Sequence, residues 1–418
     1  MPERLIYKRQ KAKAKKAASF LISAAAICVI LGGVIESAAC VVASQGQSRI
    51  AMARERSFAK ITAGAGSFVW NMWSNARCSV VCHMARNHLI EIADKFVRPA
   101  LASRLPTRFD DDLRVLKLKN GCMVSLIEAT VTMFARFAAR AQWEMLAPLL
   151  GGYHPSRYKL IFKDVLDSVA ARWMSGGLLD LAKVPLHDWK RPGRRDTFAD
   201  WALSIFARSG ASPRVIGFID GTFRPVCRPG GEDWLQRLLY NGYEAEHGLK
   251  YQSFAAPCGL IFDMYGPVVG SHSDSTILAM SGLEGKLRAV SDAAGVVYIG
   301  YADSAYAMSD FILRGCKRHM IFNEDHQRMQ SAMNGVRTSV EWGFGIVGND
   351  WQWVHIEDVQ KVLLSPCGLY FKIASILSNL KTCLNAGNLI SDYFGCPPPF
   401  LDQYLAMAPA PQAAAAGE

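Results

Sequence analysis

The spacing of apolar residues changes along this chain from a helical period to a strand period. Between residues 121 and 150 apolar side chains recur every three or four positions, which predicts helix. Gly151–Pro155 breaks the pattern, and Ser156 is a suitable N-cap for a second helix. Its apolar stripe consists of Ile161, Val165, Leu166, Val169 and Trp173. We therefore expect an all-helical region over 61–206, with a helix-turn-helix-like pair at about 121–175.

From about residue 207 short apolar runs replace the helical spacing. Lys250–Ala256 and Leu260–Val269 flank Pro257–Gly259, which is typical of a β-hairpin. Further strands are expected at 214–220, 296–303 and 319–323, and helices at 275–288, 327–347 and 358–387. Strands followed by alternating strands and helices indicate an α/β domain, with a mixed sheet flanked by helices, over 207–390. Residues 391–418 are rich in Pro and Ala and are expected to form a low-complexity tail.

The N-terminal extension, residues 1–60, allows two interpretations. A basic cluster, Lys8 to Lys16, is of the kind that binds nucleic acid or directs nuclear import. It is followed by Ala17–Ile35, which carries no charge and is just long enough to span a bilayer. This run is rich in Ala, Gly and Ser. We favour a buried or partner-packing helix and keep a membrane segment as the alternative.

Charge and cysteine usage narrow the class of protein. The chain has 418 residues and a net charge of +11, and its basic excess lies in residues 1–206, whereas 207–418 is mildly acidic. A polyanion would therefore be held mainly by the first half, although basic residues also merely solubilise helices. The 11 cysteines are odd in number and scattered, which indicates a reducing compartment. Four possible zinc ligands, Cys78, Cys82, His83 and His88, are close in sequence. We favour buried thiols on a helix over a zinc site as the interpretation of these cysteines.

Three acidic residues follow or lie within predicted elements in an order that suggests metal chemistry. Asp220 closes the apolar run 215–219, Asp303 closes the run 296–302, and Glu341 lies in a helical segment. Buried carboxylates are unfavourable unless a positive charge meets them, and converging oxygen ligands bind Mg²⁺ or Mn²⁺. Taken singly, each motif has an ordinary explanation. Asp220 could start a turn, Asp274 could cap a helix, and Arg337 with Glu341 could form a surface ion pair.

Taken together, the motifs resemble a known family over roughly 125–405. They are IDGT at 219–222, RPGG…LYNGY at 228–243, HGLKYQ at 247–252, the YGP…SHSDS stretch at 265–275, YADSAY at 301–306 and NxxRxxxEWxFG at 334–345. This ordered set is similar to PIF/Harbinger-type transposases, the group that includes domesticated Harbinger transposase-derived nucleases of the DDE superfamily.

The resemblance implies an RNase H-like nuclease domain with catalytic Asp220, Asp303 and Glu341. Asp274 would join these three as a metal ligand, and Arg337 would support the site or face phosphate. Lys250 is a further candidate DNA contact, as are Arg157 and Lys159 on the expected outer side of the second helix of the pair. The implied reaction is an in-line cleavage of DNA phosphodiester bonds assisted by two divalent cations, Mg²⁺ or Mn²⁺.

The resemblance also implies DNA as partner, a separate Myb-like DNA-binding protein and a nuclear location, and it is compatible with a homo-oligomer. Membrane association through Ala17–Ile35 is the alternative location. Two departures from the family are Glu244 and Glu246, where basic residues are usual, and Ser271–Asp274 in place of a Gly-x-His-His-Asp-like segment. The alternative function is a catalytically inactive, domesticated DNA- or chromatin-binding protein that keeps the fold.

Overall fold

The structure, a computed structural model, describes residue 70 and residues 73–187, 196–210, 212–231, 233–315, 323–356 and 360–409. The basic cluster, the apolar run Ala17–Ile35, the basic segment Lys190–Arg195 and most of the strand expected at 319–323 lie outside these residues. Within the described ranges, no helix has the length and apolarity needed to cross a membrane.

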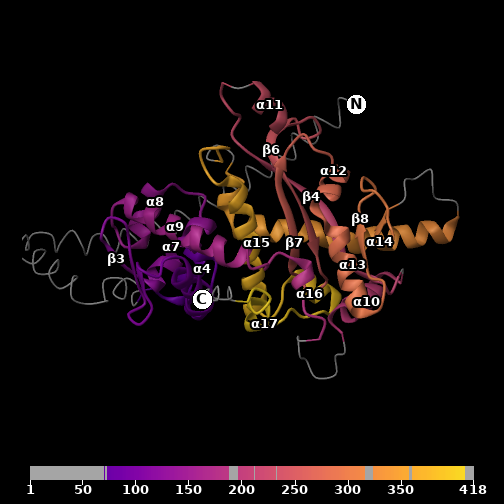
Figure 1. Cartoon of the computed structure of the whole chain (residues 1–418), viewed down its shortest axis with the longest axis horizontal. Coiled ribbons are helices and arrows are strands. Elements are labelled where there is room, and N and C mark those ends of the chain that lie inside the picture. Colours follow the sequence, from indigo (N-terminus) through magenta and orange to yellow (C-terminus); the bar gives the residue numbers. More distant parts are fainter. Residues whose placement is uncertain are drawn as a thin grey trace, which may run out of the picture.

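The first part of the chain is mainly helical and surrounds helix α7, as Figure 1 shows in indigo and purple. Its elements are α4 (Asn75–Cys82), α5 (Arg86–Ile92), the π-helical turn η2 (Ala93–Val97), α6 (Arg98–Arg104), α7 (Leu126–Ala138), α8 (Trp143–Leu150), α9 (Pro155–Val169), the π-helical turn η3 (Ala170–Met174) and the 3₁₀ turn η4 (Leu181–Lys183). Helix α7 is central because nearly all its side chains are buried. The stripe expected on the second helix is also buried, as are Cys78 and Cys82.

Two expectations for this part were wrong. The region is not all-helical, because three short antiparallel strands form a small sheet in the order β1-β2-β3. They are β1 (Phe109–Asp110), β2 (Val115–Lys117) and β3 (Met123–Ser125). The helix expected over 121–150 is divided into β3, α7 and α8, since Ser125 caps α7 and the chain turns again before Trp143. The apolar spacing continued through these breaks, so periodicity alone did not reveal them.

Helices α8 and α9 are joined through Gly151–His154, and the helix-turn-helix-like pair expected at about 121–175 stays a prediction. Trp143 of α8 stacks on Tyr158 of α9, with ring centroids 6.4 Å apart. This contact and the packing of α9 on α7 describe ordinary bundle packing. A DNA-binding role for the pair stays a prediction.

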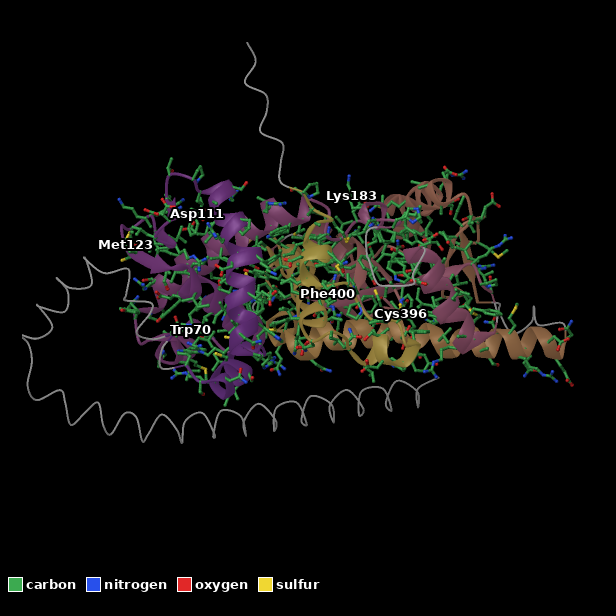
Figure 2. The ribbon with its side chains drawn as sticks, turned by 90° about the horizontal axis from the view of Figure 1, so that it is seen from below. Trp70, Asp111, Met123, Lys183, Cys396 and Phe400 are labelled. Atoms are coloured by element: carbon green, nitrogen blue, oxygen red, sulfur yellow. The ribbon has the colours of Figure 1, made fainter. Side chains whose placement is uncertain are left out.

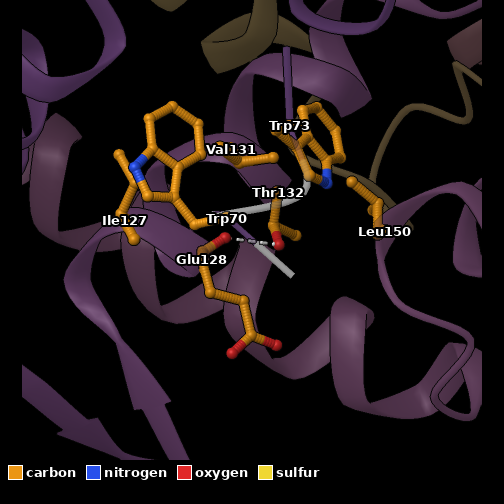
Figure 3. A pocket seen from close by; sticks show the side chains of 7 residues that line it. All are labelled: Trp70, Trp73, Ile127, Glu128, Val131, Thr132 and Leu150. Atoms are coloured by element: carbon orange, nitrogen blue, oxygen red, sulfur yellow. Dashed lines mark hydrogen bonds between the residues drawn. The ribbon is translucent and has the colours of Figure 1, made fainter. Parts of the chain in front are cut away.

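A small pocket in this helical part is lined by Trp70 and Trp73, by residues of α7 and by Leu150 of α8 (Figure 3). The Thr132 hydroxyl donates to the carbonyl oxygen of Glu128 at 2.7 Å beside it. Its lining is mostly apolar, and the Glu128 carboxylate is held by Arg157. We assign no chemistry to this pocket.

The second part contains a mixed sheet covered by helices on both faces, to the right in Figure 1. Its elements are α10 (Thr197–Ser209), β4 (Val215–Pro225), α11 (Asp233–Leu239), β5 (Tyr240–Asn241), β6 (Glu246–Ala255), β7 (Ile261–Val269), α12 (Asp274–Ser281), α13 (Leu283–Ala294), β8 (Ile299–Ala302), β9 (Ile312–Arg314), α14 (Glu324–Asp350), the 3₁₀ turn η6 (Gln352–His355), α15 (Cys367–Leu384), α16 (Leu389–Phe394) and α17 (Leu401–Leu405).

Strand β4 is the centre of this sheet. It pairs antiparallel with β6, which pairs antiparallel with β7 and β5, and on its other side it pairs parallel with β8, which pairs parallel with β9. This mixed sheet with helices on both faces is consistent with the RNase H-like fold that the sequence implied. The parallel strand after β8 is β9, which the sequence reasoning did not predict. The single helix expected over 275–288 is two helices, because Gly282 between them has φ 65°.

The domain boundaries need two corrections. Helix α10 begins at Thr197 and packs on the sheet, with Trp201 stacked 5.0 Å from Phe262, so the sheet domain starts before residue 207. Residues 391–409 are not a tail. They contain most of α16 and all of α17, and Tyr404 is fully buried with its hydroxyl donating to the carbonyl oxygen of Leu178 at 3.2 Å.

The two parts share one hydrophobic core. Trp351 at the end of α14 packs edge-on against Phe134 of α7 at 5.6 Å, and its indole donates to the Ser378 hydroxyl at 2.9 Å. Figure 2 places Cys396 and Phe400 among the helices in the middle of the molecule, between the two parts. Trp351 therefore joins α7 of the helical part to α15 of the second part.

Candidate active site

Asp220 lies within β4 rather than at its end. Residues 215–219 are apolar and fully buried, and the burial of the strand decreases at Asp220. The strand nevertheless continues to Pro225, because β6 pairs with it from Phe218↔Ala255 to Pro225↔Gly248. The end of the apolar run marked the point where the strand becomes accessible, and not the end of the strand.

Asp303 lies beside Asp220 because β8 is the parallel neighbour of β4. Ile219 pairs with Ala302, so both aspartates directly follow paired residues. One oxygen of each carboxylate accepts a backbone hydrogen bond from the next residue, from Gly221 at 2.9 Å and from Ser304 at 2.6 Å. Parallel pairing therefore brings together two carboxylates far apart in sequence.

Glu341 approaches the strands from α14 through an arginine. Arg337, one turn earlier on the same helix, contacts a carboxylate oxygen of Asp220 with Nη1 at 3.3 Å. Its Nη2 lies 3.3 Å from an oxygen of Glu341. The Arg337 and Asp220 side chains are 16% and 17% exposed, whereas Glu341 is 54% exposed. Arg337 thus links Glu341 of α14 to Asp220 of the sheet.

Burial and neighbouring charge act together on Asp220. The pKa of Asp220 is raised to about 6: burial is the largest cause, Arg337 and the Gly221 amide lower it, and the negative charges of Glu341 and Asp303 add to the rise. Glu341 and Asp303 therefore both lie within electrostatic reach of Asp220. One arginine does not neutralise them.

Asp274 lies on the other face of the sheet. Side chains of successive strand residues point to opposite faces, and a Cβ on Gly221 would meet Asp274 Oδ1 at 3.0 Å. There Asp274 forms an ion pair with Lys250 of β6 at 3.0 Å. The cap of α12 is Ser273, whose hydroxyl oxygen accepts from the Thr276 amide, so Asp274 is the first residue of the helix and not its cap.

The donor set fits a divalent cation in type and in charge. The four carboxylates, Asp220, Asp274, Asp303 and Glu341, face two cations, Arg337 and Lys250, which leaves negative charge to be balanced. Carboxylate oxygens are the ligands that Mg²⁺ and Mn²⁺ prefer. Across the residues that the structure describes, no three His, Cys, Asp or Glu side chains are grouped closely enough to hold a metal. Asp220 and Asp303 are the two carboxylates that the pairing of β4 with β8 brings side by side.

Two predicted DNA contacts of the helical part have different surroundings. The Arg157 side chain is 13% exposed and lies in an ion pair with Glu128 at 3.0 Å, so its expected position on the outer side of α9 was wrong. Lys159 is 54% exposed and lies 3.3 Å from Glu144. Their contact with DNA is untested.

One residue that the sequence reasoning did not single out lies among the carboxylates. Tyr306 is 1% exposed, and its hydroxyl has no hydrogen-bond partner among the described residues. A Cβ on Gly221 would lie 3.4 Å from this hydroxyl. The sequence signal that could have identified Tyr306 is its position at the end of the YADSAY segment, three residues after Asp303.

The comparisons with known proteins agree with this geometry at a coarse level. Residues 219–379, from β4 into α15, match a family model described as DDE superfamily endonuclease. No curated protein and no solved structure matches the chain. The match supports the superfamily, and the PIF/Harbinger subtype stays a prediction.

Proposed function

We propose that this protein is a metal-dependent DNA endonuclease of the transposase type. The observation that carries the proposal is the pairing of β4 with β8, which places Asp220 beside Asp303 within the segment that matches DDE endonucleases. Glu341 on α14 adds a third carboxylate through Arg337. Its substrate would be DNA, and we extend the proposal to a nuclear location and to a separate Myb-like DNA-binding partner.

Each residue of the site has a proposed role. Asp220 and Asp303 would hold a divalent cation, Mg²⁺ or Mn²⁺, with Glu341 as a further ligand, whereas Asp274 lies on the other face of the sheet and pairs with Lys250. When bound there, such a cation would supply charge stabilisation at a scissile phosphate and would lower the pKa of a coordinated water. Arg337 holds Asp220 and Glu341 together and presents positive charge toward a phosphate. Lys250 keeps Asp274 against β4.

The test is nicking of supercoiled DNA by the full chain with Mn²⁺ or Mg²⁺. We expect wild type to nick and Asp303→Ala to be inactive. Asp292→Ala, on the exposed side of α13, is the matched control and should retain wild-type nicking. Equal nicking by wild type and Asp303→Ala would contradict the proposal.

One observation favours a second candidate, a non-catalytic DNA-binding protein that keeps the fold. Arg337 engages two of the three core carboxylates, and an arginine at that position satisfies negative charge without a metal. In that case plasmid DNA would bind, neither wild type nor Asp303→Ala would nick it, and Mn²⁺ would not raise the melting temperature of the protein.

A further inference from the structure

Arg224 lies on the same face of β4 as Asp220. The pairing of β4 with β6 is regular from Phe218 to Pro225, so side chains alternate between the faces and those of Asp220 and Arg224 point the same way. Four residues of strand span about 13 Å, which is close to the length of about four base pairs of B-DNA. A DNA duplex that reaches Asp220 can therefore also reach Arg224.

Arg224 is partly buried and forms no ion pair with a carboxylate of the described residues. Its guanidinium carbon lies 4.1 Å from the ring centroid of Phe371 on α15. Its Nη1 lies 3.3 Å and 3.4 Å from the two ring nitrogens of His355, and its Nε has no hydrogen-bond partner among the described residues. A buried charge without a counter-ion is costly. The positive charge of Arg224 is thus held against two rings with a donor unused.

His355 is held in place beside Arg224 by α14. A Cβ on Gly348 would collide with its Nε2, so the ring requires glycine at this position. The residue nevertheless remains exposed, as does Arg140 after α7. Burial of the ring, and then the charges of Arg224 and Arg140, lower the pKa of His355 to about 4. The imidazole is therefore neutral at pH 7 and can donate one hydrogen bond, while the arginines supply the positive charge.

The side of α14 between the carboxylates and His355 is open. Glu341, Gly345 and Gly348 follow Arg337 at intervals of four, four and three residues, which puts them on one side of the helix. Glu341 and Gly345 are exposed, and a Cβ on Gly345 would meet nothing within 4 Å. The side of α14 that carries Arg337 and Glu341 therefore continues toward His355 through two residues without side chains.

We propose that Arg224, together with His355, binds a DNA backbone phosphate about four nucleotides from the phosphate at Asp220, and that the DNA follows the glycine-bearing side of α14. The inference deepens the proposed function, because it rests on DNA as the substrate, and it requires no metal ion. An arginine suits this role because its planar guanidinium can donate two parallel hydrogen bonds to phosphate oxygens. The phosphate supplies the counter-charge that Arg224 lacks.

The test measures binding of a fluorescently labelled DNA duplex of mixed sequence to the full chain by anisotropy, with EDTA present, over a series of NaCl concentrations. In Arg224→Met the slope of log affinity against log salt should fall by about one, and affinity at low salt should fall about tenfold, because one phosphate contact is lost. Arg224→Lys should keep the wild-type slope, since it keeps the charge.

Arg288→Met is the matched control. Arg288 of α13 also lies over an aromatic ring, that of Phe311 at 4.7 Å, and its substitution removes the same charge elsewhere. It should keep the wild-type slope and affinity.

A charge added to the open side of α14 tests the path of the DNA and leaves Arg224 and its packing intact. Gly345→Asp has room for its side chain and should lower DNA affinity about tenfold, because a carboxylate repels phosphate. Gly335→Asp places the same charge on another side of α14, where a Cβ also meets nothing within 4 Å, and should bind DNA like wild type.

An unchanged salt slope in Arg224→Met, or equal losses in Arg224→Met and Arg288→Met, would overturn this inference alone. A lower melting temperature of Arg224→Met with unchanged DNA affinity would also overturn it, since Arg224 would then serve packing. Equal DNA affinities of Gly345→Asp and Gly335→Asp would overturn the path along α14. A wild type that binds no DNA would overturn the proposed function and this inference together.

Discussion

The molecule contains two partly buried arginine–carboxylate pairs. They are similarly buried, but they differ in the number of carboxylates that each arginine contacts. Arg157 and Glu128, in the helical part, are 13% and 7% exposed, and Arg337 and Asp220, at the sheet, are 16% and 17% exposed. Arg157 uses Nε and Nη2 on both oxygens of Glu128 at 3.0–3.3 Å, and its Nη2 also donates to the Met123 carbonyl oxygen at 3.1 Å.

Arg337 is less completely paired. It contacts Asp220 and Glu341 once each, at 3.3 Å, and its Nε is buried without a hydrogen-bond partner among the described residues. One arginine therefore serves two carboxylates, and Asp303 adds a third. A pair matched one to one leaves no charge to be balanced, whereas a carboxylate cluster with too few cations keeps the capacity to bind one more.

The largest effect is expected from removing charge at the unbalanced cluster. Asp220→Asn should lower the rate of DNA nicking by about 10³-fold, because the loss of a charged ligand removes stabilisation at the scissile phosphate. Glu128→Gln should nick like wild type at temperatures where it remains folded. Similar losses of nicking in both variants would mean that the two clusters do not differ in function.

Replacing each arginine by alanine should destabilise the protein, and we expect Mn²⁺ to restore stability only at the Arg337 pair. Arg157→Ala leaves Glu128 buried and unpaired, so we expect a loss of about 3–5 kcal/mol in the free energy of unfolding, measured with urea, whether or not Mn²⁺ is present. Arg337→Ala should also be destabilised, and Mn²⁺ should restore most of the loss. Restoration by Mn²⁺ in both variants would contradict this comparison.

The raised pKa of Asp220, about 6, predicts a pH dependence with a defined sign. A carboxyl that holds its proton more tightly when folded adds stability below its unfolded pKa of 3.8, and this contribution is lost as pH rises through about 6. Asp220→Asn lacks that loss. Its unfolding free energy relative to wild type should therefore increase between pH 4 and pH 8, by an amount on the order of 2–3 kcal/mol. An unchanged difference across this range would refute the assignment.

A smaller effect on Mn²⁺ affinity is expected at Gly221, where Asp274 and Tyr306 pack closely against β4. In Gly221→Ala the new methyl group would meet Asp274 at 3.0 Å and the Tyr306 hydroxyl at 3.4 Å. Such crowding costs about 1–3 kcal/mol and should weaken Mn²⁺ binding several-fold. Gly230→Ala, where a Cβ would meet nothing within 4 Å, should bind Mn²⁺ like wild type. Equal affinities in both variants would exclude a role for this close approach.

The smallest effect on stability is expected at the exposed pair of Lys159 and Glu144. Lys159→Ala should change the unfolding free energy by less than about 0.5 kcal/mol. If Lys159 contacts a DNA phosphate, as the sequence predicts, the slope of log affinity against log salt should fall by about one in a plasmid-binding titration. An unchanged slope would remove Lys159 from the DNA contacts.

The sheet and its aspartates could be predicted because their signals are local. An apolar run that ends at a carboxylate is visible in sequence at Asp220 and at Asp303, and the parallel pairing of their strands follows from the fold class. The partners of these residues depend on tertiary contacts. The bridge from Arg337 to Asp220 and the position of Asp274 across β4 required the folded chain, as did the buried pairing of Arg157, because each spans elements distant in sequence.

Binding of Mn²⁺ to the full chain at pH 7.5, measured by isothermal titration calorimetry, tests the carboxylate site most directly. Wild type and the control Asp292→Asn should bind with the same affinity, and Asp303→Asn should lose binding. Equal Mn²⁺ affinity in Asp303→Asn and Asp292→Asn would show that Asp220 and Asp303, which follow the last paired residues of β4 and β8, do not hold a cation.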